Sequence, residues 1–176
     1  MIEGFGVYLD TLREENLHQY LQWRNDERIF KWCRQFDLIT EREHQAWFEK
    51  IQTDPSTRMY EMLDSVNLRL IGVCGLTSVD HKNQSAKFSL YVEPDFQGCG
   101  AGSKALKLLV KHGFENLNLN HIFGETFEDN PAAKVFEKLG FTKEGTRRQF
   151  YNRRGKFIDA HLYSMLRSDK AWQEWH

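Results

Sequence analysis

The feature that most constrains how this chain can fold is a glycine-rich turn, residues 97–103, which carries Gly98, Gly100 and Gly102. A predicted strand ends just before the turn at Pro94, and a predicted helix begins directly after it. Glycine lets the backbone approach a ligand closely and adopt positive φ. The unpaired N–H groups in the first turn of the helix, aided by the helix dipole, form an anion site. The turn therefore predicts a site for a phosphate-bearing ligand.

The spacing of the glycines separates several kinds of phosphate site. A dinucleotide fingerprint needs a third glycine where this chain has Ser103. A P-loop needs the order Gly-Lys-Ser/Thr, which is reversed in Gly102-Ser103-Lys104. The pattern that fits is Gln-x-x-Gly-x-Gly at Gln97, Gly100 and Gly102. The alternative at this point is an ordinary glycine-rich turn between a strand and a helix.

The periodicity of apolar residues predicts one α+β domain over residues 1–176, in the order β-α-α-β-β-β-α-β-α-β-β. Thr40 and Glu43 form a capping box that begins one helix. Asn130 and Pro131 begin another, which ends at Gly140. Strands are predicted over 4–10, 58–64, 69–78, 87–92, 122–127, 142–151 and 157–166, and helices over 12–23, 40–54, 103–115 and 130–140.

Charge and composition exclude several classes of protein. The 24 Lys and Arg residues nearly balance the 25 Asp and Glu residues, so there is no global electrostatic basis for binding nucleic acid or a membrane surface. We expect a cytoplasmic protein, because no apolar run could span a membrane and the first residues do not have the pattern of a signal peptide. Cys33, Cys74 and Cys99 match neither a disulfide framework nor a zinc site, so we expect reduced thiols and no metal.

Residues 125–141 carry a second motif, in which a strand is followed by Asn130, a short helix and the sequence Leu139-Gly140-Phe141. Together with the glycine turn, this motif resembles the GNAT superfamily of acyl-CoA N-acyltransferases, and the order of elements agrees over nearly the whole chain. The resemblance implies an α+β GNAT fold. In that fold a mixed central sheet of about seven strands is splayed at the fourth and fifth strands and flanked by about four helices.

The same resemblance implies acetyl-CoA as co-substrate and no metal. The pantetheine arm would lie in the splay along residues 90–92, opposite 122–127, and a backbone N–H near Val92 would stabilise the oxyanion. The pyrophosphate would lie on residues 97–103. The cofactor-binding residues predicted in this way are Leu90, Tyr91, Val92, Gln97, Gly98, Cys99, Gly100, Ala101, Gly102, Ser103, Asn130, Ala133 and Phe136.

The resemblance also implies direct attack of an amine on the thioester in a ternary complex. A lysine-like amine has a pKa of about 10.4 and costs roughly 4.6 kcal/mol to deprotonate at pH 7, so a neighbouring carboxylate would help. Glu125 matches a strand position that supplies the base in some members of the family, and Glu93 is the second candidate and His81 the third. The alternatives are that Glu125 faces solvent or pairs with a lysine, and that Glu93 is a turn residue.

Phe136 departs from the family pattern, because many members have a tyrosine there whose hydroxyl protonates the departing thiolate. A thiol has a pKa of about 8.5, so an unprotonated thiolate leaves at a disadvantage of only about 2 kcal/mol near pH 7. Tyr91, Tyr151 or water could act in place of the missing hydroxyl, and the sequence does not choose among them.

The acceptor side is predicted from two aromatic segments. Residues 23–26 resemble a Trp-Arg-Asn element of the branch that includes ribosomal-protein N-terminal acetyltransferases and nucleotide-aminosugar N-acetyltransferases, and the helix at 44–48 favours the aminosugar side. The alternative is that the aromatic residues belong to the core and that the arginine is an ion-pair partner. The substrate-binding residues predicted here are Trp23, Arg24, Asn25, His44 and Trp47.

The predicted hairpin at 147–156 concentrates five cations in ten residues. It could clamp the diphosphate of a nucleotide-linked sugar, or it could be a solvated turn.

From the family resemblance as a whole we predict an N-acetyltransferase that acts on a primary amine, with a nucleotide-linked amino sugar as the favoured acceptor. The alternatives are acetylation of the N-terminus or a lysine of a protein, such as a ribosomal protein, and a CoA-binding regulatory module without turnover. A nucleic-acid-binding role for the hairpin is disfavoured by the charge balance, no membrane partner is expected, and the protein is expected to be a monomer or a homodimer.

Overall fold

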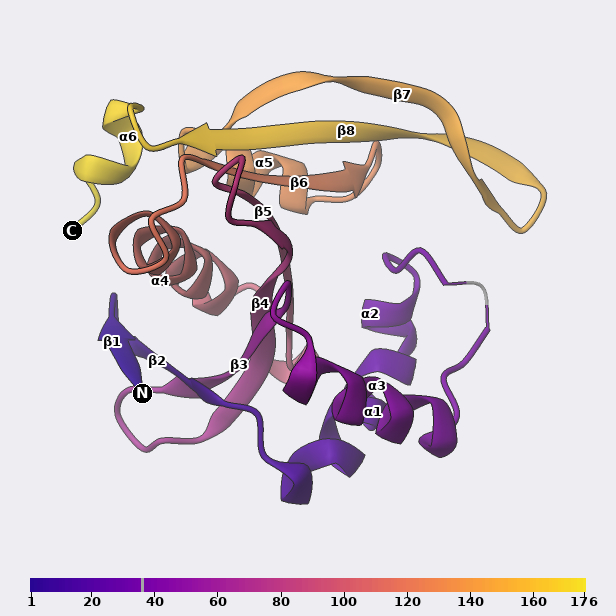
Figure 1. The fold of residues 1–176 in the computed structure, drawn as a ribbon. Helices are drawn as coiled ribbons and strands as arrows, with labels where there is room; N and C mark the ends of the chain where they lie inside the picture. Colours follow the sequence, from indigo (N-terminus) through magenta and orange to yellow (C-terminus); the bar gives the residue numbers. More distant parts are fainter. Residues whose placement is uncertain (36) are drawn as a thin grey trace.

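The computed structural model describes residues 1–35 and 37–176. Its centre is a sheet of eight strands in the order β1-β2-β3-β4-β5-β6-β8-β7 (Figure 1). Neighbouring strands are antiparallel, except for β5 and β6, which are parallel. The strands are β1 (Ile2–Gly4), β2 (Val7–Thr11), β3 (Arg58–Asp64), β4 (Leu70–Asp80), β5 (Ser85–Val92), β6 (His121–Phe127), β7 (Thr142–Arg153) and β8 (Lys156–Leu166).

Helices cover both faces of the sheet, and a separate apolar core lies under each group (Figure 1). One core joins the sheet to α4 and α5, and the other joins it to α1 and α3 through side chains such as Tyr20 and Phe48. The helices are α1 (Leu17–Asn25), α2 (Glu27–Phe30), α3 (Glu41–Thr53), α4 (Ala101–Glu115), α5 (Ala132–Lys138) and α6 (Lys170–Gln173), with 3-10 turns η1 (Glu14–Asn16) and η2 (Pro94–Phe96).

Local signals in the sequence predict several of these elements correctly. The capping box at the start of α3 is present, because the Thr40 hydroxyl accepts a hydrogen bond from the Glu43 N–H and the Glu43 carboxylate accepts one from the Thr40 N–H. At the start of α5, the Asn130 side chain accepts a hydrogen bond from the Ala132 N–H at 2.9 Å. Both contacts satisfy donors that a helix N-terminus otherwise leaves unpaired.

The predicted splay of the sheet is confirmed, between β5 and β6. These strands pair only over residues 85–87 and 121–123. Beyond that point residues 88–92 stay paired with β4, while residues 124–127 stay paired with β8. The two parallel strands therefore separate toward their C-terminal ends and leave an opening in the middle of the sheet. The expected α+β architecture with a splayed mixed sheet is confirmed, with eight strands where about seven were expected.

The N-terminal elements differ from the prediction. The expected strand over 4–10 is two strands, β1 and β2, joined by a turn at Phe5 and Gly6, which both have positive φ. This hairpin moves the splay from the fourth and fifth strands to the fifth and sixth. The expected helix over 12–23 begins as a 3-10 turn and becomes α-helical only at Leu17. The short helices α2 and α6 were not predicted, since four residues are too few to establish a periodicity.

The hairpin of β7 and β8 reaches beyond the sheet toward the segment that follows α2 (Figure 1). Near its tip, Arg153 donates a hydrogen bond to the backbone carbonyl of Cys33. Arg154 lies 3.7 Å from the carboxylate of Glu27 in α2. The hairpin thus closes one side of the opening between β5 and β6. None of the helices in the described ranges is both long enough and apolar enough to cross a membrane.

Candidate functional site

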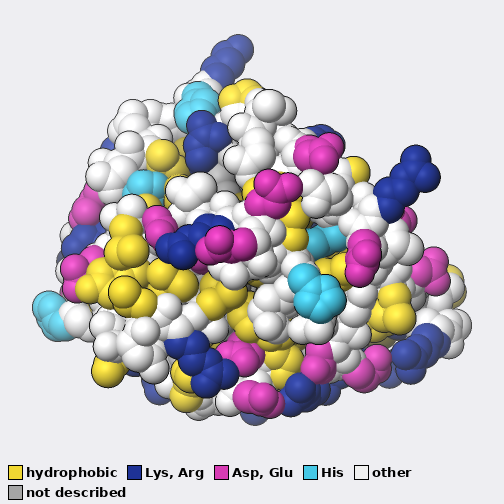
Figure 2. Space-filling model, turned by 90° about the horizontal axis from the view of Figure 1, so that it is seen from below, with side chains coloured by type: hydrophobic (Ala, Val, Ile, Leu, Met, Phe, Trp, Pro, Cys, Tyr) yellow, Lys and Arg dark blue, Asp and Glu magenta, His cyan; other side chains and the backbone are white. Residues whose placement is uncertain are grey.

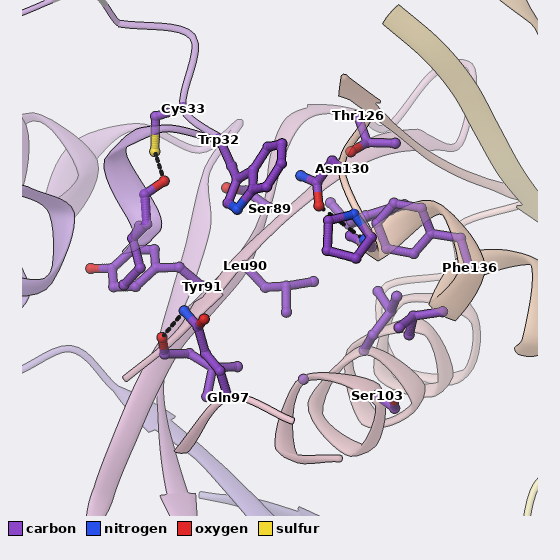
Figure 3. Close-up of a pocket in the computed structure, with 18 of the residues that line it drawn as sticks. Trp32, Cys33, Ser89, Leu90, Tyr91, Gln97, Ser103, Thr126, Asn130 and Phe136 are labelled. Atoms are coloured by element: carbon purple, nitrogen blue, oxygen red, sulfur yellow. Dashed lines mark hydrogen bonds between the residues drawn. The ribbon is translucent and has the colours of Figure 1, made fainter. Parts of the chain in front are cut away.

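A cavity of about 670 Å³ occupies the opening between β5 and β6. Its lining comes from α2 and the residues after it, from β5, from the glycine turn with the start of α4, and from the end of β6 with the start of α5. Figure 3 shows Trp32, Ser89, Leu90 and Phe136 around this space, on elements far apart in the sequence. The splay therefore creates the cavity, and the glycine turn lies at its edge.

The glycine turn has the open backbone that an anion site requires. Gly98 and Gly100 have φ values of +83° and +86°, and a Cβ on either glycine would meet nothing within 4 Å. A Cβ on Gly102 would lie 3.3 Å from the Val92 side chain and 3.4 Å from that of Leu90, so the start of α4 packs tightly against β5. The first N–H groups of α4 are thereby held at the mouth of the opening, where an anion can accept from them.

The edge of β5 that faces the opening has free backbone groups. The N–H of Glu93 donates to the carbonyl of Ile71 on β4 at 2.8 Å. Because hydrogen-bonded and non-hydrogen-bonded residues alternate along an antiparallel pair, the backbone groups of Leu90 and Val92 point away from β4, toward β6. The Gln97 side chain approaches the Val92 carbonyl at 3.4 Å (Figure 3). An extended ligand could therefore pair with this edge as a strand would.

Most of the predicted cofactor-binding residues line the cavity. Cys99 and Ala133 do not: the Cys99 thiol points to the carbonyl oxygen of Phe96 at 2.8 Å, and Ala133 packs against the core beneath α4 and α5. The predicted residues that line the cavity are Leu90, Tyr91, Val92, Gln97, Gly98, Gly100, Ala101, Gly102, Ser103, Asn130 and Phe136.

Thr126 is a cavity residue that the sequence analysis missed. Its side chain lies near Asn130 and Phe136 (Figure 3), it is only 6% exposed, and its Oγ1 atom has no hydrogen-bond partner among the described residues. Phe136 is packed against Phe88 and Tyr163 and has no polar atom to offer in its side chain. A buried hydroxyl without a partner is unfavourable, so Thr126 is a candidate ligand-binding group. The available signal was a polar residue on the inward-facing side of a predicted strand.

Glu125 also lines the cavity and is surrounded by hydrogen-bond donors. Its Oε1 atom accepts from Arg34 at 2.8 Å, from Lys87 at 2.9 Å and from the Tyr151 hydroxyl at 2.7 Å. Its Oε2 atom accepts from Arg147 at 3.2 Å. Burial by itself would raise the pKa of Glu125, but the hydrogen bonds from Tyr151 and Lys87 and the nearby charges outweigh burial and lower the pKa. Glu125 is therefore ionised at neutral pH.

The other predicted base candidates lie elsewhere. Glu93 is outside the cavity lining, and both of its carboxylate oxygens accept from Arg69, at 2.9 and 3.0 Å. His81 is an exposed residue of the turn between β4 and β5 and does not line the cavity. Among the residues that line the cavity in the described part of the chain, Glu125 is the one carboxylate.

The structure brings only one of the five predicted acceptor residues to the cavity. This residue is Arg24, whose guanidinium lies over the ring of Tyr91 at 5.6 Å and donates to the Gln35 side chain. Trp23 is 6% exposed and lies in the core between the sheet and α1. This position agrees with the alternative that the aromatic residues belong to the core. The Asn25 side chain donates to the Ile39 carbonyl at 2.8 Å and accepts from the Ile39 N–H at 2.9 Å, so it is engaged in backbone contacts.

His44 and Trp47 also pack against this core. Their rings stack with centroids 5.0 Å apart, and the His44 side chain is 5% exposed. Burial lowers the pKa of His44, and the charge of Arg24 lowers it further. The buried imidazole is therefore neutral at pH 7, its Nε2 atom has no hydrogen-bond partner among the described residues, and it does not line the cavity.

The segment after α2 supplies cavity-lining residues that the sequence did not indicate. Trp32, Cys33, Arg34 and Gln35 all line the cavity. Within residues 1–35 and 37–176, no group of three His, Cys, Asp or Glu side chains is arranged to hold a metal ion.

Comparison with known proteins identifies a family. The model of the acetyltransferase (GNAT) domain matches residues 7–142. An uncharacterized N-acetyltransferase, p20, of Bacillus licheniformis is 33% identical over 103 residues, which are 58% of each chain. The chain thus spans little more than half the length of p20, and the same holds for a second curated relative. Another relative, named "Putative ribosomal N-acetyltransferase YdaF", of Bacillus subtilis, is 27% identical over 85% of this chain and 83% of its own.

Among solved structures, a spermidine N-acetyltransferase from Vibrio cholerae in complex with CoA and spermine has the same fold. Its TM-score is 0.89 at 22% sequence identity, over 97% of this chain and 100% of that one.

Proposed function

The chain belongs to the GNAT acetyltransferase family, and on that premise we propose that it transfers the acetyl group of acetyl-CoA to the primary amine of a small molecule. The observation that carries this proposal is the opening between β5 and β6, which has a free strand edge on one side and a glycine turn at its mouth. The single domain expected over residues 1–176 and the expected monomer or homodimer stay predictions.

The residues around the opening fit the coenzyme. The backbone of the glycine turn and the first N–H groups of α4 suit a diphosphate, because they are donors without bulky side chains. The free edge at Leu90 and Val92, with Asn130 opposite, suits the amide groups of the pantetheine arm. The unpaired Thr126 hydroxyl supplies one further donor within the cavity.

Bound acetyl-CoA supplies a thioester at which an N–C bond forms as the C–S bond breaks and sulfur leaves as a thiolate. The N–H of Val92 points into the opening and is the backbone donor that we assign to the developing oxyanion. Glu125 is the carboxylate that we assign to receive the proton of the amine, directly or through water, since it is ionised and lines the cavity. Glu93, held by Arg69 outside the cavity, is the weaker candidate.

The acceptor that we propose is a small amine, with an amino sugar, nucleotide-linked, as the favoured class. Arg153 at the tip of the β7–β8 hairpin bonds the Cys33 carbonyl and so narrows access to the cavity, which favours a small molecule over an amine on a folded protein. The hairpin also contributes Arg147 beside Glu125. The names of the relatives refer to different acceptors, so similarity alone does not select one.

The test is thiol release from acetyl-CoA with a panel of amines, which includes glucosamine, lysine, a peptide with a free N-terminus and spermidine. We expect release with at least one small amine and tight binding of CoA by calorimetry. Binding of CoA without release by any amine would favour the regulatory module. Absence of binding to both CoA and acetyl-CoA at millimolar concentrations would overturn the proposal.

Two further alternatives have distinct signatures. Release with the peptide alone would support acetylation of a protein. Binding of nucleic acid would be revealed by a salt-dependent shift, but acidic and basic side chains are interspersed on the face of the molecule seen from below (Figure 2), which disfavours this role.

A further inference from the structure

The charged residues of the cavity are mostly cations. Four basic side chains line it, those of Arg24, Arg28, Arg34 and Lys87, against the single carboxylate of Glu125. Arg28 is bound to Asp26 and Asp95, and Arg24 lies over Tyr91 and donates to Gln35. Arg24 forms no ion pair among the described residues, so the uncompensated positive charge of the cavity lies at Arg24 and around Glu125.

Three cations surround that one carboxylate. Arg34, Lys87 and Arg147, which we call the cationic cluster, each place a nitrogen within 3.2 Å of a Glu125 oxygen. The cluster therefore exceeds its carboxylate by two positive charges. Burial lowers the pKa of Lys87, the hydrogen bond with Glu125 raises it, and the charges of Arg34 and Arg147 lower it further, as expected where cations crowd together.

Two members of the cluster keep free capacity for a ligand. The side chains of Arg34 and Arg147 are 53% and 48% exposed, whereas that of Glu125 is 7% exposed. Each guanidinium has several N–H donors and directs one nitrogen to Glu125 in the described part of the chain. A hollow of about 240 Å³ next to the main cavity is lined by Lys87, Glu125 and Arg147. Glu144 also lines this hollow, and its Oε1 atom is hydrogen-bonded to His121 at 3.3 Å and accepts from the Ser164 hydroxyl at 2.7 Å.

We propose that the acceptor amine carries a phosphate group, which binds to Arg34 and Arg147 while its amine lies in the main cavity. This inference rests on the proposed function and specifies the acceptor. A phosphate monoester has a charge of about −1.5 to −2 at pH 7, which matches the excess charge of the cluster. The planar guanidinium also binds phosphate oxygens through two parallel hydrogen bonds.

The same charges argue against a polyamine acceptor. A polyamine is a chain of cations, and its several ammonium groups need carboxylates to balance their charge. The single carboxylate of this cavity already accepts from three cations and from the Tyr151 hydroxyl. A spermidine-like acceptor would enter beside the cationic cluster and be repelled. This chain therefore differs in acceptor from the Vibrio cholerae spermidine N-acetyltransferase, although it shares the fold.

The experiment compares two amines that differ only by a phosphate, glucosamine and glucosamine 6-phosphate, with spermidine as a third ligand. Calorimetry is done on the full chain saturated with CoA, which allows binding without turnover. We expect glucosamine 6-phosphate to bind at least about tenfold more tightly than glucosamine, because a hydrogen bond to a charged group contributes about 1.5 kcal/mol or more. Spermidine should bind more weakly than the phosphate ester.

Variants locate the phosphate site. Arg34→Gln and Arg147→Gln should each remove most of the preference for the phosphate ester over glucosamine. Arg148→Gln is the matched control, because Arg148 is exposed on the same strand and forms no ion pair among the described residues. Arg147→Lys keeps the positive charge but lacks the planar guanidinium that forms two parallel hydrogen bonds to phosphate, so it should retain part of the preference. CoA affinity and the melting temperature establish that each variant is folded.

The outcomes separate this inference from the proposed function. Equal binding of glucosamine and its phosphate, tighter binding of spermidine, no binding of any of the three amines, or an unchanged preference in both arginine variants would overturn the phosphate site. Acetylation of some other amine would in each of those cases leave the proposed function standing. Failure to bind CoA would overturn the proposed function, and the phosphate site with it.

Discussion

The Tyr151 hydroxyl donates a 2.7 Å hydrogen bond to the Oε1 atom of Glu125. The two residues belong to β7 and β6, which are not neighbours in the sheet, because β8 lies between them. The contact exists because the β7–β8 hairpin extends past the end of β6 (Figure 1). The Tyr151 ring also packs edge-on against Phe127, with centroids 5.2 Å apart. The hairpin therefore helps to set the electrostatic state of the candidate base.

Replacement of Tyr151 by phenylalanine should raise the pKa of Glu125. The hydrogen bond from Tyr151 is one of the contacts that hold this pKa below its ordinary value. With a more basic Glu125, the acidic limb of the kcat/KM profile should move to higher pH. The measurement is the pH dependence of thiol release, with Tyr8→Phe, far along the chain on β2, as control. An acidic limb at an unchanged pH would mean that Glu125 does not control it.

Replacement of Glu125 by glutamine should lower kcat by roughly 100- to 10,000-fold, the usual contribution of a general base. The affinity for CoA should stay within about twofold, because the hydrogen bonds of Glu125 involve none of the residues of the glycine turn. Glu93→Gln is the matched control and should have little effect on kcat, since Glu93 is held by Arg69 outside the cavity. The opposite ranking of the two variants would assign the base to Glu93.

The same Glu125→Gln variant should change how stability depends on pH. The pKa of Glu125 is lower in the folded chain than its ordinary value, so ionised Glu125 stabilises the fold above that ordinary value, and this contribution disappears as the pH falls through the folded value. The difference in unfolding free energy between wild type and variant should therefore favour wild type more at neutral pH than in acid. Denaturant unfolding over this range tests it, and a difference that grows in acid would contradict the direction.

Replacement of Thr126 by valine should weaken binding of CoA without destabilising the protein. The Thr126 hydroxyl is buried and unpaired among the described residues, so its removal leaves no partner unsatisfied and should not lower the melting temperature. A lost hydrogen bond of about 0.5–1.5 kcal/mol corresponds to a loss of affinity of about two- to tenfold. Thr126→Ser keeps the hydroxyl and should bind CoA as wild type does. Equal affinities of all three proteins would mean that the hydroxyl does not contact the coenzyme.

The sequence predicts best what depends on neighbouring residues. The capping box of Thr40 and Glu43 and the glycine turn are local patterns, and their structures follow from backbone requirements at those positions. The turn at Phe5 and Gly6 was missed because the alternation of apolar residues continues through it and conceals the reversal of the chain. The residue type of a phenylalanine gives no indication that its φ will be positive.

The acceptor side of the cavity could not be predicted in the same way. Arg34 donates to Glu125, and Arg153 bonds the carbonyl of the neighbouring Cys33, and both are contacts between residues far apart in the sequence. Spacing alone also cannot distinguish a core aromatic residue from a ligand-binding one, which is why Trp23 was expected at the acceptor site and lies in the core.

Replacement of Gly100 by alanine should separate backbone strain from steric exclusion in the glycine turn. Gly100 has φ +86° and a Cβ there would meet no atom within 4 Å, so the penalty comes from the left-handed conformation alone. Such a conformation costs an L-residue about 1–2 kcal/mol, and we expect a loss of stability of this size together with weaker binding of CoA. Gly100→Asn is the matched variant, because asparagine tolerates this conformation better, and it should recover part of both losses. Alanine and asparagine variants of equal stability would show that strain at this position does not set the cost.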